Sequence, residues 1–166
     1  MNKLNLEDLK KQAEREAPST KKFIKRLKKH KKSINIDDKV HELHEEVFEY
    51  INCLECGNCC KSISPIIYDK DILRISRHLK VRPSEFTEQY LRLDEEGDYV
   101  FQNLPCPFLM TDNYCSIYAF RPRSCREYPL TDQTNFHRLF DLTLKNTYIC
   151  PAVFDIMNKL KNKIRI

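Results

Sequence analysis

The stretch CLECGNCC at residues 53–60 constrains this chain more than any other part of its sequence. In each C-x2-C spacing, the two intervening residues form a tight loop that brings both sulfurs to one metal, and Gly57 permits a turn conformation that a side chain would oppose. Thiolates are soft ligands that select zinc, iron-sulfur clusters or copper(I), whereas calcium and magnesium prefer oxygen. The stretch therefore predicts a thiolate metal site.

Four further cysteines bring the total to 8 in 166 residues, which is below the density of secreted disulfide scaffolds. The sequence has no apolar run long enough to span a membrane and no apolar signal-peptide core in its first 30 residues. We therefore expect a cytoplasmic protein, in which thiols stay reduced. On this reading the cysteines are better interpreted as metal ligands than as a disulfide framework.

The spacing leaves the cofactor open between zinc and an iron-sulfur cluster. Consecutive side chains diverge, so Cys59 and Cys60 are expected to share a single mononuclear ion only with strain. Two zinc sites would use all eight thiolates, whereas one cubane cluster would use four. Cys106 and Cys150 each precede a proline, as the last cysteine of bacterial ferredoxin runs does, and this favours iron-sulfur slightly.

The net charge of +5 lies entirely in the first 45 residues, which hold 13 Lys or Arg and 8 Asp or Glu. We predict a basic helical N-terminal extension over 1–35, followed by a cysteine-cluster metal-binding domain over 36–166. The block from Lys21 to Lys32 can bind nucleic acid or an anionic surface. A solvated helical face is the favoured alternative, because Phe23, Ile24 and Leu27 recur at helical spacing.

The periodicity predicts a mainly α fold with a small irregular β component, in a single domain nucleated by metal. One helix is expected to stop at Pro18, and another, capped by Asp37 or Asp38, to lead directly into Cys53. SPIIY is expected to form a short strand. The elements of the region 97–130 are expected to be short and irregular, with PCPFLMTDNYCSIY (residues 105–118) forming two short strands about a turn at Asp112 and Asn113. The other predicted elements are helices over 19–32, 69–79, from Pro83 to Leu91, and from Pro151 to Ile164. The helix over 69–79 is expected to turn Ile72, Leu73, Ile75 and Leu79 inward, and the last helix to carry Val153, Phe154, Met157, Leu160 and Ile164 on one face.

Several side chains around Cys125 suit a site for a cofactor or an anionic group. Guanidinium groups can offset thiolate charge or clamp an anion, and tyrosines can donate hydrogen bonds to sulfur or take part in proton transfer. Support of a structural metal is the favoured reading of the two. The predicted residues are Tyr118, Arg121, Arg126 and Tyr128.

CLECGNCC, followed by CPFL, CSIYAFRPRSCREYP and a late ICP, resembles the bacterial and archaeal cysteine-cluster family called YkgJ. The resemblance covers roughly residues 51–151 and implies a zinc- or iron-chelating domain. The metal ligands that the resemblance implies are Cys53, Cys56, Cys59, Cys60, Cys106, Cys115, Cys125 and Cys150. The family shares its motif with flagellin lysine N-methylases. It therefore also suggests a cluster-dependent enzyme, such as a protein-lysine N-methyltransferase or an oxidoreductase.

A metal-binding protein with an unknown protein partner or substrate is the first reading of the sequence. With only two glycines, the chain lacks the glycine-rich loop of a nucleotide-binding fold, which disfavours a conventional S-adenosylmethionine site. The C-x2-C-x2-C-C spacing also departs from the C-x3-C-x2-C of radical S-adenosylmethionine enzymes.

Overall fold

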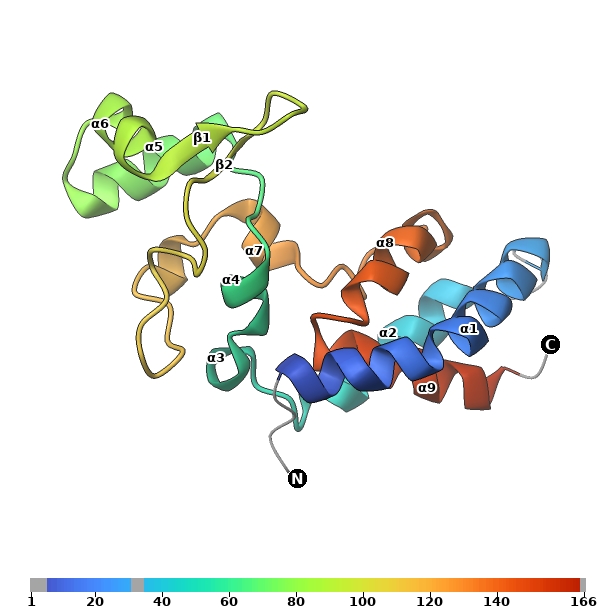
Figure 1. Ribbon diagram of the computed structural model, residues 1–166. Helices are drawn as coiled ribbons and strands as arrows, with labels where there is room; N and C mark the ends of the chain where they lie inside the picture. The colour runs from blue at the N-terminus through green and yellow to red at the C-terminus, as the bar shows by residue number, and fades with distance from the viewer. Residues whose placement is uncertain (1–5, 31–34, 165–166) are drawn as a thin grey trace. The chain divides into compact units, whose positions relative to one another are not determined.

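The computed structural model describes residues 6–30 and 35–164, which fold mainly into helices and form two compact units (Figure 1). The first unit consists of residues 1–52 and 129–166, and the cysteine unit consists of Cys53–Tyr128. The predicted mainly helical fold with a small β component is confirmed. None of the described helices is long and apolar enough to cross a membrane. The predicted boundary at residue 35 stays a prediction.

Helices that are distant in the sequence pack together in the first unit. Both α1 and α2 contact α9, and α8 contacts α1 and α9. The shared core includes Leu9, Val40, Leu43, Val153 and Ile156, each fully buried. The elements of this unit are α1 (Leu6–His30), α2 (Ile36–Phe48), η2 (Phe136–Leu139), α8 (Phe140–Asn146) and α9 (Pro151–Lys163).

Helix α1 passes through Pro18 without ending, so the predicted stop at this residue is wrong. Pro18 is exposed, and the apolar face continues on both sides of it, with Ala13 and Ala17 buried before it and Ile24 and Leu27 buried after it. A proline inside a helix costs about 3 kcal/mol, because it removes one hydrogen bond and crowds the preceding turn. Burial of one uninterrupted stripe offsets that cost.

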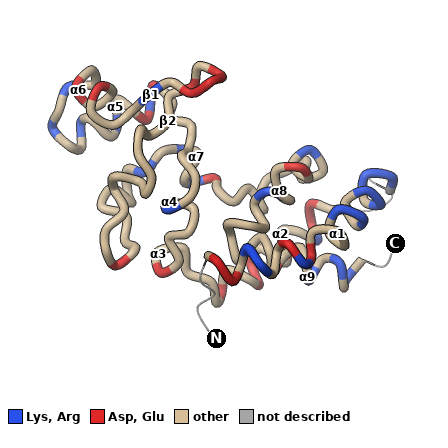
Figure 2. Tube along the Cα trace, in the orientation of Figure 1, with Lys and Arg blue, Asp and Glu red and all other residues tan. Residues whose placement is uncertain are grey.

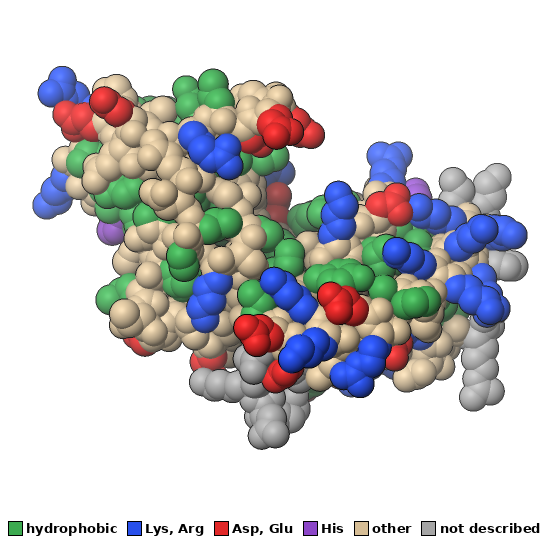
Figure 3. Space-filling view, in the orientation of Figure 1, with side chains coloured by type: hydrophobic (Ala, Val, Ile, Leu, Met, Phe, Trp, Pro, Cys, Tyr) green, Lys and Arg blue, Asp and Glu red, His purple; other side chains and the backbone are tan. Residues whose placement is uncertain are grey.

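The basic residues of α1 occupy the face opposite its buried stripe. Phe23, Ile24 and Leu27 are buried, whereas the lysines and the arginine between Lys21 and Lys29 are exposed. Figure 2 marks Lys and Arg positions along α1 in blue, and Figure 3 shows positive side chains on the surface in the same part of the view. Lys28 forms an ion pair with Asp141 at 2.9 Å. This arrangement is the predicted solvated helical face, and nucleic-acid or anionic-surface binding through Lys21 to Lys32 stays a prediction.

Helix α2 begins and ends differently from the prediction. Its N-cap is Asn35, and Asp37 instead accepts hydrogen bonds from the backbone N–H groups of Asn135 and Phe136, at 2.7 and 2.9 Å. The helix ends at Phe48, and Cys53 begins a separate short helix. The predicted Asp37 or Asp38 cap and the direct entry into the cysteines are therefore wrong, because Asp37 is used to hold the turn that starts η2.

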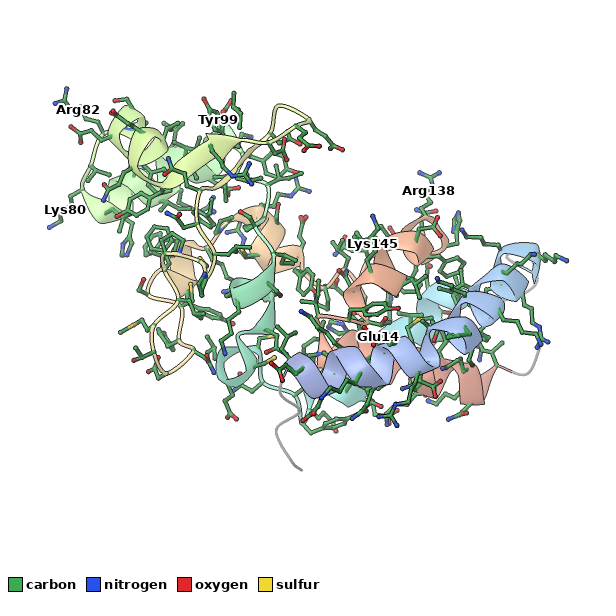
Figure 4. All side chains as sticks on the ribbon, viewed as in Figure 1. Glu14, Lys80, Arg82, Tyr99, Arg138 and Lys145 are labelled. Carbon is green, nitrogen blue, oxygen red and sulfur yellow. The ribbon has the colours of Figure 1, made fainter. Side chains whose placement is uncertain are left out.

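The cysteine unit combines short helices with a two-stranded antiparallel sheet, in which Leu91 pairs with Phe101 and Leu93 with Tyr99. Its core contains Ile67, Ile75 and Phe86 together with other apolar side chains of α5, α6 and the strands. Lys80 and Arg82, labelled in Figure 4, flank the turn between α5 and α6. The elements are α3 (Cys53–Cys56), α4 (Asn58–Ser62), α5 (Asp69–Leu79), α6 (Pro83–Tyr90), β1 (Leu91–Leu93), β2 (Tyr99–Phe101), η1 (Tyr118–Phe120) and α7 (Arg123–Glu127).

Two local predictions in this unit are wrong. SPIIY does not form a strand, although hydrogen bonds connect it to β2. The Phe101 N–H donates to Ser64 Oγ at 2.7 Å, and the Ile67 N–H donates to the Tyr99 carbonyl at 2.7 Å. Leu73, predicted to face inward, is 54% exposed. Helix α5 turns Ile72 and Ile75 toward the core and leaves Leu73 on the opposite side.

Candidate metal centre

Two turns bring the cysteine motif against a second loop of the cysteine unit. Gly57 has φ +60 and joins α3 to α4, and a Cβ at this position would lie 3.1 Å from Cβ of Asn113. Asn113 itself has φ +68, and its side-chain amide donates to the Glu55 carbonyl at 2.9 Å. This glycine is required both for its left-handed backbone and for the close approach of the second loop.

The second loop carries two of the cysteines. Leu109 and Cys115 form an antiparallel bridge about the turn at Asn113, which is the hairpin-like geometry that the sequence predicted between residues 105 and 118, although no full strands form. The Cys106 N–H donates to the Cys60 carbonyl at 2.7 Å, so this loop is hydrogen-bonded directly to α4. Cys125 lies on α7.

The adjacent thiols of Cys59 and Cys60 do not diverge. Their sulfurs lie 4.0 Å apart and form a hydrogen bond. Two ligands of one tetrahedral zinc at the usual Zn–S distance lie about 3.8 Å apart, so this separation suits a shared metal. The predicted strain at the Cys59–Cys60 pair is thus not required by the backbone.

The pKa values of several thiols are linked to the charge of Cys60. The Cys59 hydrogen bond lowers the pKa of Cys60 to about 7. Burial raises the pKa of Cys125 to about 12 and that of Cys106 to about 11, and the charge of Cys60 adds to both shifts. Desolvation also raises the pKa of Cys53, Cys56 and Cys115, and the charge of Cys60 again contributes to each of these shifts. Cys60 is therefore within electrostatic reach of five other thiols.

Backbone donors surround the sulfurs and oppose these upward shifts. The N–H of Asn58 lowers the pKa of Cys56, those of Phe108 and Leu109 lower that of Cys106, and that of Ile117 acts on Cys115. Hydrogen bonds from N–H groups to sulfur are a means by which proteins stabilise and tune metal-bound thiolates. The loops already present such donors where thiolates would carry charge.

Asn58 supplies a further donor that has no protein partner. Its side chain is 6% exposed, and its Nδ2 is buried without a hydrogen bond in the described structure. A buried donor without a partner costs about 1–3 kcal/mol, so an acceptor at this position is favoured. The residue stands between Cys56 and Cys59, where thiolate or sulfide would be that acceptor. Sequence reasoning missed Asn58, and only its place inside the motif could have indicated it.

Arg121 is the predicted cofactor-site residue with the clearest role. Its guanidinium opposes the raised pKa values of Cys53, Cys115 and Cys125. The guanidinium carbon lies 3.8 Å from the centre of the Tyr118 ring, and Nη1 donates to the Tyr118 carbonyl at 2.9 Å. Tyr118 thus positions a positive charge beside three thiols. Arg126 is exposed and Tyr128 is half-buried, and their predicted contact with a cofactor stays a prediction.

Cys150 lies in the first unit, buried as the N-cap residue of α9, whereas the other seven cysteines lie in the cysteine unit. All seven carry free thiols, and Figure 4 shows sulfur atoms in this part of the chain. Among the described residues, no group of three His, Cys, Asp or Glu side chains already has the geometry of a metal site. The donor types and the unpartnered Asn58 amide fit a thiolate-bound metal.

Comparison with known proteins places these features in a wider group. Residues 52–148 match the sequence profile of the CxxCxxCC family, described as a "putative zinc- or iron-chelating domain". The matched segment is more than half of the chain; it contains the seven cysteines of the cysteine unit and ends before Cys150.

A curated protein is also similar to part of this chain. An uncharacterized protein of Methanocaldococcus jannaschii, MJ0661, is 31% identical over 91 residues, which are 53% of this chain and 49% of that protein. The chain therefore spans about half the length of this relative. No solved structure matches significantly.

Proposed function

The chain belongs to the CxxCxxCC family of zinc- or iron-chelating domains, and we propose that it is a metal-binding protein whose cysteine unit holds zinc or an iron-sulfur cluster. The presence of seven cysteines in one compact unit, with the Cys59 and Cys60 sulfurs 4.0 Å apart, is the observation that carries this proposal. Thiols gathered this closely are favourable as ligands, because a metal cation neutralises the charges that otherwise repel one another.

The residues that would hold the metal come from four separate segments. The proposed ligand set is drawn from Cys53, Cys56, Cys59, Cys60, Cys106, Cys115 and Cys125. Asn58 Nδ2 and the backbone N–H groups would donate to the sulfurs, and Arg121 would offset their negative charge. When bound, zinc supplies a redox-inert cross-link, and an iron-sulfur cluster supplies a one-electron centre.

The family match supports a seven-cysteine set. The matched segment contains the seven cysteines of the cysteine unit and ends before Cys150. We retain the eight-cysteine set as the alternative that the experiment below distinguishes.

The test is metal and acid-labile sulfide content, with a visible spectrum, on protein purified without oxygen. Iron with acid-labile sulfide and an absorbance at about 400 nm identifies an iron-sulfur cluster, whereas zinc without colour identifies a structural zinc site. Cys60→Ser should lose most of the bound metal, while the matched Cys150→Ser should retain it. Equal metal content in the wild type and Cys60→Ser would contradict the proposal, and loss in Cys150→Ser would favour the eight-cysteine set.

A further inference from the structure

A second site lies on the outer face of α5, where a cavity of about 320 Å³ is lined by basic and aromatic side chains. The spacing of Lys70, Arg74 and Arg77 places their side chains on one face of the helix, opposite the buried Ile72 and Ile75. The full lining is Lys70, Leu73, Arg74, Arg77, His78 and Phe120.

The charge of this lining has one sign. It contains two exposed cations, Lys70 and Arg77, and the partly buried Arg74, and no carboxylate belongs to it. Asp71 pairs with Arg74 at 2.6 Å from the core side and so neutralises only one of the three positive charges. Cations gathered around a concave surface favour an anionic ligand, because a cavity concentrates their field.

The floor of the cavity is held in place by several contacts. Arg74 Nη2 donates to the Arg121 carbonyl at 2.9 Å and to the Phe120 carbonyl at 3.4 Å. The rings of His78 and Phe120 stack with their centres 4.0 Å apart and nearly parallel planes. The cationic group at the base is therefore already ordered before any ligand arrives, which lowers the entropic cost of binding.

A donor at this base also has no protein partner. Nε of Arg74 is buried without a hydrogen bond in the described structure, while Nη2 of the same guanidinium has three acceptors. Guanidinium groups bind phosphate or carboxylate oxygens with two parallel donors, so a free Nε beside further cations is suited to an anion.

The apolar part of the lining narrows the ligand class. Leu73 is 54% exposed, although its neighbours Ile72 and Ile75 are buried, and the aromatic pair of His78 and Phe120 stands beside it. Cavities that hold small molecules begin at about 300 Å³, so this one suits a single small molecule. Flat rings stack on aromatic side chains, and this adds affinity to the charge contacts.

We propose that this cavity binds a small phosphate-bearing molecule with a flat apolar ring, of the nucleoside monophosphate class. The phosphate contacts Arg77, Lys70 and the Arg74 guanidinium, and the ring packs against Leu73 and the aromatic pair. The site lies outside the cysteine motif, and its occupancy does not depend on which metal that motif binds.

The test is calorimetric titration of the purified full chain with adenosine 5′-monophosphate, adenosine, inorganic phosphate and a short oligoribonucleotide. We expect saturable binding of the monophosphate, and at least tenfold weaker binding of adenosine and of phosphate, because each carries half of the recognised chemistry. Arg77→Ala should weaken monophosphate binding at least tenfold. The matched control Arg92→Ala removes an exposed arginine of β1 outside the cavity and should leave it unchanged.

Three outcomes would overturn the proposal. The first is absence of monophosphate binding at concentrations on the order of 1 mM, which is already the weak limit of specific association. The second is an equal effect of Arg77→Ala and Arg92→Ala on binding, and the third is binding of the oligoribonucleotide alone, which would assign the basic face to nucleic acid. Because Arg77 is exposed, its replacement is not expected to impair folding, and an unchanged melting temperature checks this.

Discussion

Replacing Asp71 by asparagine is expected to destabilise the cysteine unit by about 3 kcal/mol. The carboxylate is 1% exposed and accepts three hydrogen bonds, from Arg74 Nη2 at 2.6 Å, from the Arg123 N–H at 3.1 Å and from the Tyr68 N–H at 3.2 Å. It therefore holds the first turns of α5 and α7 and pairs with a partly buried cation. An asparagine keeps the shape but loses the charge and turns one acceptor into a donor.

The magnitude follows from these contacts. Breaking a buried ion pair costs about 3–5 kcal/mol, and a hydrogen bond to a charged group contributes about 1.5–3 kcal/mol. Because the Arg74 side chain is 29% exposed, water recovers part of the loss, and the lower end of the range applies. In a unit of this size 3 kcal/mol lowers the melting temperature by about 12–24 °C.

Urea denaturation of the metal-loaded protein measures the change directly. The matched control is Asp69→Asn, an exposed acid in the same helical turn, which is expected to have little effect. A free energy of unfolding for Asp71→Asn that equals that of the control would refute the reasoning. Loss of metal content in Asp71→Asn alone is the accompanying expectation, because Asp71 positions the helix that carries Cys125.

Three further predictions concern the two units separately. Pro18→Ala should raise the stability of α1 by about 1–3 kcal/mol in thermal denaturation, since it restores a helix donor at an exposed position; a decrease would show that the helix needs its proline. Asn58→Ala should weaken metal binding about 10–100-fold in chelator competition, and unchanged affinity would show that its amide does not serve the sulfurs. Metal affinity should fall as pH falls from 8 to 6, by about tenfold per pH unit for each ligand such as Cys106 or Cys125. Burial raises the pKa of these thiols, and each must lose a proton to bind the metal. Equal metal affinities at the two pH values would contradict this prediction.

Periodic helices were predictable from the sequence, because their buried faces recur at intervals that local residues alone define. Helix α9 begins at Pro151 and buries Val153, Met157 and Leu160 as expected. Helix α1 shows where this reasoning fails: local backbone preference ends a helix before Pro18, whereas the continuous stripe buried by α8 and α9 extends through it. Packing between distant segments outweighed a local preference of known size.

The candidate site was predictable in its residue types but not in its organisation. The C-x2-C spacings correctly indicated a turn at Gly57, which the structure shows with a positive φ. The contact between Cys60 and Cys106, in which the Cys106 N–H donates to the Cys60 carbonyl, depends on how α4 and the loop at Cys106 and Cys115 meet, and neither segment alone encodes it. The same holds for Leu73, which sequence periodicity assigned to the core and the structure leaves at the edge of a cavity.

The distribution of burial within the cysteine unit explains why its motif and its core lie in different elements. The buried apolar cluster is supplied mainly by α5, α6 and the strands, and Cys106 and Cys115 pack only at its margin. Helices α3 and α7 bury no residue, and α4 buries only Asn58. Helices of four or five residues are not stable alone, so these three depend on tertiary contacts that hydrophobic burial does not provide. A metal bound by the proposed cysteines would supply such contacts, because each thiolate ligand would tie one of these short helices to the others. Metal-binding energy would then contribute the folding energy that hydrophobic burial does not provide.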